Sequence, residues 1–373
     1  MNEKIKEVQA LGQSFWYDNI ERGALESGEM QSLIDDGITG VTSNPTIFMK
    51  AITGSDAYDE AIRRLARQGL EAYEIYDRLV LEDIAGAADI LRPVYDRTGG
   101  RDGYVSIEPN PALAYDVEGT VKEIRRLLNT LDRPNVMAKA PGTPEAVPAI
   151  EQLLSEGYNI NITLLFSPFI YEEVANAYVS ALEKLDAGGG DLSQVASVAS
   201  FFVSRVDTAV DKQLEELIDN QGHENLKILL GTAAIANCKR AYKRFQNIFG
   251  SERFARLKEK GARVQRPLWA STSTKNPGYS DTMYVNSLIG PDTVNTLPRV
   301  TLEAFKDHGI AASTLESGID DEAKEVIKNL FAAGIDLKQV TDDLLKEGVK
   351  LFSQSLDQLL ESIDKKRSRI LAE

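Results

Sequence analysis

One lysine interrupts a short apolar segment near the middle of the chain. In residues 135–143, a strand pattern of valine, methionine and alanine contains Lys139 and is ended by a proline and a glycine. A charged amine is costly to bury, and burial favours the neutral amine, which is the form that attacks a carbonyl carbon. The segment therefore indicates a lysine that forms a Schiff base. A lysine on an exposed edge strand, where it discourages aggregation, fits the same pattern.

Polar residues recur two positions apart near the ends of several other apolar segments. The pairs are Thr42 and Asn44, Ser106 and Glu108, and Asn161 and Thr163, and Lys139 follows Met137 at the same spacing. Side chains two apart on a strand share a face, and the apolar residues between them face the other way. If these segments are parallel strands, their polar side chains gather at the carboxyl-terminal mouth of a barrel, where barrel enzymes place their chemistry.

Each of these residues also has a structural explanation of its own. Asp18 fits a helix N-cap or a solvated loop, and Asn44 before a proline fits a turn. Glu108 fits a surface charge at a strand end, and Asn161 and Thr163 fit groups that pair with backbone in a satisfied core. One at a time, these explanations are as good as the chemical one. Together they require several coincidences at equivalent strand ends.

The order of elements predicts the scaffold that would hold these groups. Strands are expected at residues 14–18, 40–44, 104–108, 136–140, 159–166, 197–203, 267–271 and 293–297, and helices at residues 116–131, 143–156, 167–185, 205–218 and 225–249. This alternation favours an α/β fold, and eight strands are the number that a (β/α)8 TIM barrel needs. Residues 319–371 predict additional terminal helices. We expect a single domain over residues 1–373, with extra C-terminal helices from about residue 319.

Composition narrows the function. The net charge of −15, without a basic block, argues against a nucleic-acid partner, and the basic residues 365–369 are expected to cap a helix end. The chain shows neither an apolar run long enough to cross a membrane nor a signal region, which predicts a cytoplasmic protein without a membrane partner. His223 fits a loop, His308 a helix end and Cys238 a buried thiol, so histidine-base and metal chemistry have little support.

Six segments, in order, resemble the transaldolases. They are GVTSNPT at 40–46, the strand around Glu108, VMAKAP at 136–141, NINITLLFS at 159–167, ASFFVSRVD at 199–207 and LWASTSTKNP at 268–277. The last segment is similar to the long bacterial subgroup. The resemblance implies that a dihydroxyacetone unit passes from a ketose phosphate (sedoheptulose 7-phosphate or fructose 6-phosphate) to an aldose phosphate (glyceraldehyde 3-phosphate or erythrose 4-phosphate). This transfer belongs to the non-oxidative pentose phosphate pathway.

The resemblance also implies the catalytic roles. Lys139 matches the Schiff-base lysine, and Asp18 matches the acid/base carboxylate on the first strand. Glu108 and Thr163 match the pair that works through water while the imine forms. The protonated imine is the electron sink of this chemistry, so no metal or organic cofactor is expected.

Further matching residues are implied to hold the sugar phosphate. Asn44 and Asn161 match groups that hold substrate hydroxyls or the lysine, and Ser200 and Arg205 match donor and phosphate contacts. Ser271 aligns with a phosphate-contacting serine, but the second arginine that many transaldolases carry after the seventh strand is absent. Lys275 fits either a point charge that replaces this arginine or a residue that only caps the loop.

Two other functions fit parts of this pattern. A fructose-6-phosphate aldolase that releases free dihydroxyacetone shares the core motifs, but such enzymes are much shorter than 373 residues. A catalytically silent barrel that binds a partner is opposed by the intact set of Asp18, Glu108, Lys139 and Thr163. No interface is located by the sequence, so a monomer and a homodimer both stay open.

Overall fold

The computed structural model describes residues 1–372, and its centre is a closed barrel of eight parallel strands in the order β1 to β8. The strands are β1 (Gln13–Tyr17), β2 (Gly40–Thr42), β3 (Tyr104–Ile107), β4 (Val136–Pro141), β5 (Ile160–Leu165), β6 (Ser197–Phe202), β7 (Arg266–Ala270) and β8 (Thr293–Leu297). Each strand pairs with the next, and β8 returns to β1, which removes both sheet edges. The predicted (β/α)8 barrel is confirmed. Lys139 lies on β4, which is paired on both sides, so it is not on an edge strand.

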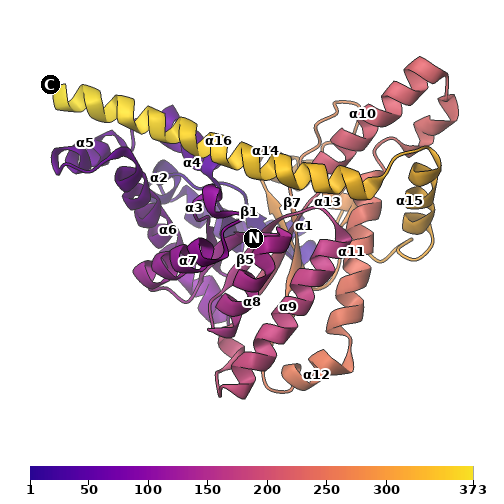
Figure 1. The fold of residues 1–373 in the computed structure, drawn as a ribbon, viewed down its shortest axis with the longest axis horizontal. Helices are drawn as coiled ribbons and strands as arrows, with labels where there is room; N and C mark the ends of the chain where they lie inside the picture. The colour runs from indigo at the N-terminus through magenta and orange to yellow at the C-terminus, as the bar shows by residue number, and fades with distance from the viewer. Residues whose placement is uncertain (373) are drawn as a thin grey trace.

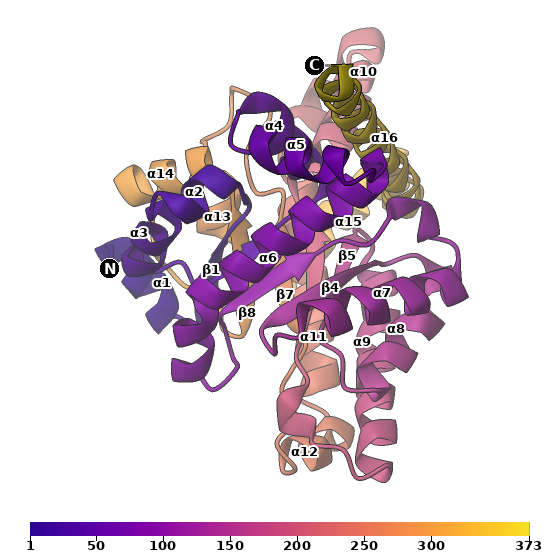
Figure 2. The same cartoon turned by 90° about the vertical axis from the view of Figure 1, so that its left-hand side faces the viewer.

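Helices surround the barrel (Figures 1 and 2). They are α1 (Glu3–Ala10), α2 (Arg22–Glu26), α3 (Glu29–Asp36), α4 (Pro45–Gly54), α5 (Asp59–Arg67), α6 (Ala72–Arg97), α7 (Val117–Leu131), α8 (Val147–Ser155), α9 (Pro168–Ala187), α10 (Ser204–Gln221), α11 (Ala233–Phe249), α12 (Glu252–Lys258), α13 (Met283–Ser287) and α14 (Arg299–His308). Four short 3-10 turns add η1 (Pro111–Leu113), η2 (Pro144–Ala146), η3 (Leu192–Gln194) and η4 (Glu224–Leu229). All eight predicted strands occur, and no strand end differs from its predicted position by more than two residues.

The single helix expected at residues 225–249 is wrong in one respect. The chain forms η4, breaks, and starts again as α11. Gly231 lies in the break with a φ of 70°, in the left-handed region that favours glycine. A Cβ at this position would also lie 2.8 Å from Cζ of Tyr279, so the glycine allows this ring to approach the backbone.

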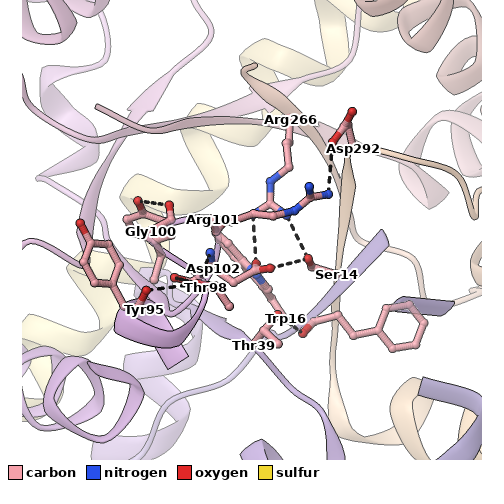
Figure 3. Close-up of polar contacts among 12 residues, drawn as sticks. Ser14, Trp16, Thr39, Tyr95, Thr98, Gly100, Arg101, Asp102, Arg266 and Asp292 are labelled. Carbon is pink, nitrogen blue, oxygen red and sulfur yellow. Dashed lines mark hydrogen bonds and ion pairs between the residues drawn. The ribbon is translucent and has the colours of Figure 1, made fainter. Parts of the chain in front are cut away.

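A buried ion pair lies at the amino-terminal end of the barrel (Figure 3). Arg266 of β7 lies 3.0 Å from Asp102, and their side chains are only 6% and 7% exposed. Asp102 also accepts hydrogen bonds from Ser14 at 2.7 Å and from the Trp16 indole at 2.9 Å. A buried carboxylate needs such partners because it has lost its water. This network holds together β1, β7 and the loop that precedes β3.

Two terminal helices follow the barrel, as predicted: α15 (Glu322–Ala332) and α16 (Leu337–Ala372). Helix α16 packs on α4, α5, α6, α10 and β5, and so it crosses the carboxyl-terminal mouth of the barrel. Figure 1 shows it as a long yellow helix, and Figure 2 looks almost along its axis. The extra helices therefore cover the end of the barrel at which the predicted site residues lie.

The basic residues 365–369 lie in the last turns of α16, but two of them bond to other helices. Lys366 lies 2.6 Å from Asp59 of α5, and Arg367 donates to the Leu70 carbonyl at 2.9 Å and to Glu71 at 2.6 Å. The prediction that this run caps its own helix is therefore wrong for these two residues. They attach the end of α16 to α5 and to the segment that precedes α6.

The positions predicted for Cys238 and for the two histidines agree with the structure. Cys238 is fully buried in α11, His223 precedes η4 in a loop, and His308 ends α14. Among residues 1–372, no helix is both long enough and apolar enough to cross a membrane.

Candidate active site

A cavity of about 320 Å³ opens at the carboxyl-terminal ends of the strands. Its lining comprises Asp18, Thr42, Asn44, Thr46, Ile47, Lys50, Lys139, Thr163, Ser200, Phe202, Arg205, Ala270, Ser271, Ser273, Lys275, Thr296, Pro298 and Phe352. Of the residues predicted for the site, all except Glu108 and Asn161 line this cavity. The fold therefore brings most of the predicted groups to one place, although they come from segments as far apart as β1 and the loop after β7.

Lys139 and Glu108 form the most buried charged contact at the mouth. The lysine Nζ lies 3.5 Å from Oε2 of Glu108, and the two side chains are 6% and 8% exposed. This distance is long for a strong hydrogen bond but well within ion-pair range. Burial raises the pKa of Glu108 to about 7, and the nearby positive charge of Lys139 opposes this shift only in part. Glu108 can therefore take up or release a proton near neutral pH.

A second, smaller cavity of about 20 Å³ adjoins this pair. It is lined by Glu108, Lys139 and Thr163 together with apolar side chains that include Leu113 and Phe352. This volume is enough for about one water molecule. The hydroxyl of Thr163 is buried and has no hydrogen-bond partner within residues 1–372. A water in this small cavity would supply a partner for it.

Asp18 lies across the larger cavity, just after β1. Thr42 donates a hydrogen bond of 2.7 Å to its carboxylate, and the Thr42 and Thr296 hydroxyls are 2.6 Å apart. Loss of solvent raises the pKa of Asp18, while Lys139 and the Thr42 hydrogen bond oppose the rise. Asp18 is therefore neither an N-cap nor a solvated loop residue. It is a more basic carboxylate than one in water.

Asn161 lies beneath the cavity rather than in its wall. Its amide donates to the Ser106 hydroxyl at 2.9 Å and accepts from the Ser200 hydroxyl at 2.6 Å, and the residue is fully buried. It is the register partner of Lys139 in the neighbouring strand. These contacts form a chain of polar side chains from β3 through β5 to β6. The backbone pairing suggested as an alternative is not how Asn161 is satisfied.

Asn44 is the N-cap of α4, where the sequence suggested a turn, and it also lines the cavity. Its side-chain oxygen caps α4 by accepting from the Ile47 amide at 2.9 Å, and Pro45 occupies the first turn of the helix. Its amide nitrogen makes no hydrogen bond to any residue in the part of the chain that the structure describes, although the residue lines the cavity. This nitrogen is available to a ligand.

Three cations line the outer part of the cavity: Lys50 of α4, Arg205 of α10, and Lys275 of the loop after β7. None has a carboxylate within 4 Å among residues 1–372. The Arg205 guanidinium lies 5.4 Å from the Phe202 ring centroid, and burial lowers the pKa of this arginine. Three unpaired cations in a chain of net charge −15 make this a favourable place for an anion.

Sequence reasoning missed Lys50 and Phe352. Lys50 follows Thr46 and Ile47 by four and three residues, so the three share one face of α4, and this spacing could have revealed the lysine. Phe352 lies on α16 and lines both cavities. No strand pattern could have indicated it, because its place depends on how α16 crosses the mouth.

The end of β5 is irregular where it meets α16. The register of β5 against β6 shifts between Ile162 and Leu165, and Leu164 has a φ of 58°. Left-handed backbone is uncommon for leucine and tends to persist where the surroundings require it. A Cβ on Gly348 of α16 would lie 2.9 Å from the Leu164 side chain, so this glycine allows the helix to come close.

A closed barrel that holds a buried lysine and two carboxylates at its mouth defines a lysine-centred (β/α)8 enzyme. The chain belongs to the family described as Transaldolase/Fructose-6-phosphate aldolase, whose model matches residues 15–363. It is 46% identical over 370 residues to Transaldolase 2 of Nostoc sp., with 97% of each chain covered. It is 45% identical over 373 residues to a transaldolase of Trichodesmium erythraeum, with 98% of each chain covered. The predicted family and enzyme class are confirmed.

Proposed function

We propose that this enzyme transfers a dihydroxyacetone unit from a ketose phosphate to an aldose phosphate through a Schiff base on Lys139. The donors are sedoheptulose 7-phosphate or fructose 6-phosphate, and the acceptors are glyceraldehyde 3-phosphate or erythrose 4-phosphate, as in the non-oxidative pentose phosphate pathway. The observation that carries the proposal is the buried Lys139 amine, 3.5 Å from Glu108 and in the same cavity as Asp18.

Imine formation uses Lys139, Glu108 and Thr163. The Nζ lone pair forms a bond to the ketone carbon, and the carbonyl oxygen takes a proton to give a carbinolamine. This hydroxyl then leaves as water with a second proton, and a protonated imine remains. A carboxylic acid with a pKa of about 7 can supply and accept these protons at neutral pH. The small cavity beside Thr163 has room for the water that relays them.

Carbon–carbon cleavage uses Asp18. Its carboxylate takes the proton of the C4 hydroxyl, the C3–C4 bond breaks, and the bonding pair moves into the imine to give an enamine. The aldose product leaves, and its aldehyde carbon is the atom that was C4 of the ketose. An acceptor aldose then enters, and the same steps run in reverse. The raised pKa of Asp18 makes it a stronger base than a carboxylate in water.

Lys50, Arg205 and Lys275 are the proposed phosphate ligands. A guanidinium contacts phosphate oxygens in a bidentate manner, whereas an ammonium acts as a point charge. Lys275 and Lys50 would together supply the positive charge of the arginine that is absent after β7. Asn44 and Ser200 would hold sugar hydroxyls without adding charge, and Asn161 would act through Ser200 from below.

We also propose that the chain forms one domain. Helix α16 packs on α4 and α6 from the first half of the barrel and on α10 from the second half. Its Phe352 lines both cavities, so the walls of the site would be incomplete without the C-terminal helix.

One experiment separates this proposal from the simple aldolase and from a silent barrel. The protein is incubated with fructose 6-phosphate and borohydride, the adduct is mapped by peptide mass spectrometry, and turnover is assayed with and without erythrose 4-phosphate. A donor adduct on Lys139 with acceptor-dependent turnover supports a transaldolase. Turnover that ignores the acceptor indicates an aldolase that releases dihydroxyacetone. The absence of an adduct on Lys139 in the parent enzyme contradicts the Schiff-base proposal, and Lys139→Met is the matched negative control.

A further inference from the structure

The loop after β7, residues 271–282, carries three residues of the cavity wall: Ser271, Ser273 and Lys275. We call this segment the substrate-facing loop. It joins β7 to α13 and lies against α10, whose second residue is Arg205. Both proposed phosphate cations on this side, Lys275 and Arg205, therefore depend on how the loop and the helix are joined.

The start of the loop is fixed to the start of α10. The Ser204 amide donates to the Ser271 carbonyl at 3.0 Å, and the hydroxyls of the two serines are also 3.0 Å apart. Ser271 has a φ of 56°, a left-handed conformation that is uncommon for serine. These contacts place the first loop residue beside Arg205.

Two tyrosines, one in the loop and one just beyond it in α13, bond to the same helix. Tyr279 donates a hydrogen bond of 2.7 Å to Asp211, and Tyr284 donates one of 2.9 Å to Asp207. Counted along α10, Asp207 and Asp211 follow Ser204 by three and seven residues, which is the spacing of a single helix face. One face of α10 thus contacts both ends of the substrate-facing loop.

The two aspartates are themselves held in place from behind. Asp207 accepts a hydrogen bond from the Ala234 amide at 2.7 Å, and Asp211 accepts one from the Gly231 amide at 2.9 Å. Their exposed fractions are 1% and 6%. A carboxylate that accepts from a backbone amide and a tyrosine hydroxyl, and that is buried, has few other orientations. The break between η4 and α11 supplies the Gly231 amide, and the first turn of α11 supplies the Ala234 amide.

A single turn connects Tyr279 to Lys275. The Tyr279 amide donates to the Asn276 carbonyl at 3.1 Å, and the Gly278 amide donates to the Asn276 side chain at 2.8 Å. This turn starts directly after Lys275 and leaves little free chain between the lysine and the tyrosine. We therefore expect a shift of the Tyr279 ring to move the Lys275 backbone.

We propose that Tyr279, through its hydrogen bond to Asp211, is a positioning residue that holds Lys275 beside Arg205 for the phosphate group of the substrate. The proposal rests on the sugar-phosphate function proposed above, and in it Tyr279 acts through Lys275. Tyr279 does not line the cavity, so it does not touch the substrate. Tyr284 and Asp207 support the same loop from its far end.

A purely structural role predicts a different result. If the Tyr279 hydroxyl only stabilises the fold, its loss lowers the melting temperature but leaves the affinity of the folded enzyme for phosphate unchanged. If it positions Lys275, its loss weakens phosphate binding and has no further effect once Lys275 is absent. Residues that act as a unit show such non-additivity in double-mutant cycles.

The test compares Tyr279→Phe, Lys275→Ala and the double variant with the parent enzyme. The dissociation constant for inorganic phosphate is measured by titration calorimetry, and KM and kcat are measured with fructose 6-phosphate. We expect Tyr279→Phe to raise the phosphate dissociation constant and the KM about fivefold, with kcat changed less than about twofold. The double variant should match Lys275→Ala in both its phosphate dissociation constant and its KM.

Tyr178→Phe is the matched control. Tyr178 of α9 donates a partly buried hydrogen bond of 2.9 Å to the carbonyl of Arg263, which precedes β7, whereas the substrate-facing loop follows that strand. Its loss should lower stability without changing phosphate affinity. Unchanged phosphate affinity in Tyr279→Phe, or additive losses in the double variant, would overturn the proposal. Calorimetry with inorganic phosphate needs no imine, so its result is independent of whether Lys139 forms an adduct.

Discussion

The Nζ atom of Lys139 lies 3.5 Å from Oε2 of Glu108, and neither side chain is more than 8% exposed. The pair is therefore close enough for a proton to pass directly or through one water. The amine must lose a proton before it attacks a carbonyl, and Glu108, which lines the small adjoining cavity, is the carboxylate within 4 Å that can accept this proton. The protonation state of Glu108 should thus control the first chemical step.

The first prediction concerns the pH dependence of activity. With a pKa of about 7, Glu108 is protonated below neutral pH and cannot accept a proton. We expect kcat/KM for fructose 6-phosphate to fall on the acid side of about pH 7, by about tenfold per pH unit. In Glu108→Gln this inflection should disappear. Glu145→Gln, a matched change at an exposed glutamate in η2, should keep the parental profile, and an unaltered inflection in Glu108→Gln would contradict the assignment.

The same shift has a consequence for stability. The pKa of Glu108 is raised from 4.5 to about 7 on folding, so the folded protein binds this proton more tightly than the unfolded chain does. The parent enzyme therefore loses stability as the pH rises between these two values. The free energy of unfolding of Glu108→Gln, relative to the parent, should rise across this window and level off above it, as measured by urea denaturation at several pH values.

Strand periodicity explains why so much of the site could be predicted from the sequence. Alternate residues of a strand share a face regardless of the rest of the fold, so Thr42, Lys139 and Thr163 had to point the same way once they were in parallel strands. Periodicity does not predict how far along the barrel axis a side chain lies from the mouth. Asn161 shares a face with Thr163, but it lies two residues earlier and therefore about 6 to 7 Å deeper, below the cavity floor.

Other parts of the site depend on contacts between distant segments. Phe352 lines the cavities because α16 returns across the mouth, and no local pattern encodes that path. The break before α11 was missed for a similar reason. Gly231 is needed there because the ring of Tyr279, from a segment far along the chain, lies against its backbone. Such requirements become visible only when the packing is known.

The second prediction separates Asp18 from Lys139. Because Asp18 is proposed to act in carbon–carbon cleavage and not in imine formation, Asp18→Asn should lower kcat about a hundredfold to ten-thousandfold. Borohydride trapping of fructose 6-phosphate on Lys139 should persist in this variant. Asp35→Asn on the surface of α3 is the matched control. If Asp18→Asn loses the adduct together with turnover, Asp18 acts earlier than proposed.

The third prediction concerns Lys50, which strand patterns did not reveal. It lines the cavity with Arg205 and Lys275. Lys50→Met should raise the KM for fructose 6-phosphate about threefold to tenfold, with little change in the rate of trapping of unphosphorylated dihydroxyacetone. The difference from the parent should shrink at high salt, because exposed charges are screened. Lys6→Met, at an exposed lysine of α1, should leave the KM unchanged. Equal losses with both donors would argue against a phosphate contact.

The fourth prediction concerns the opposite end of the barrel. Arg266→Met would leave Asp102 buried without its cation, although the Ser14 and Trp16 hydrogen bonds remain. Removal of one partner of a buried pair typically costs about 3 to 5 kcal/mol in the free energy of unfolding. The exposed pair of Arg92 and Asp96 offers a matched control, since Arg92→Met should cost less than about 1 kcal/mol.

Arg266 also tests whether the two ends of the barrel act independently. Its network lies at the amino-terminal ends of the strands, and none of its members lines the proposed active site (Figure 3). At a temperature well below its melting point, folded Arg266→Met enzyme should therefore keep the parental KM and the parental rate of borohydride trapping on Lys139. Adding Asp102→Asn should recover part of the lost stability, because an amide is less costly to bury than an unpaired carboxylate. A large change in KM without a change in stability would show that the barrel floor and the mouth are coupled.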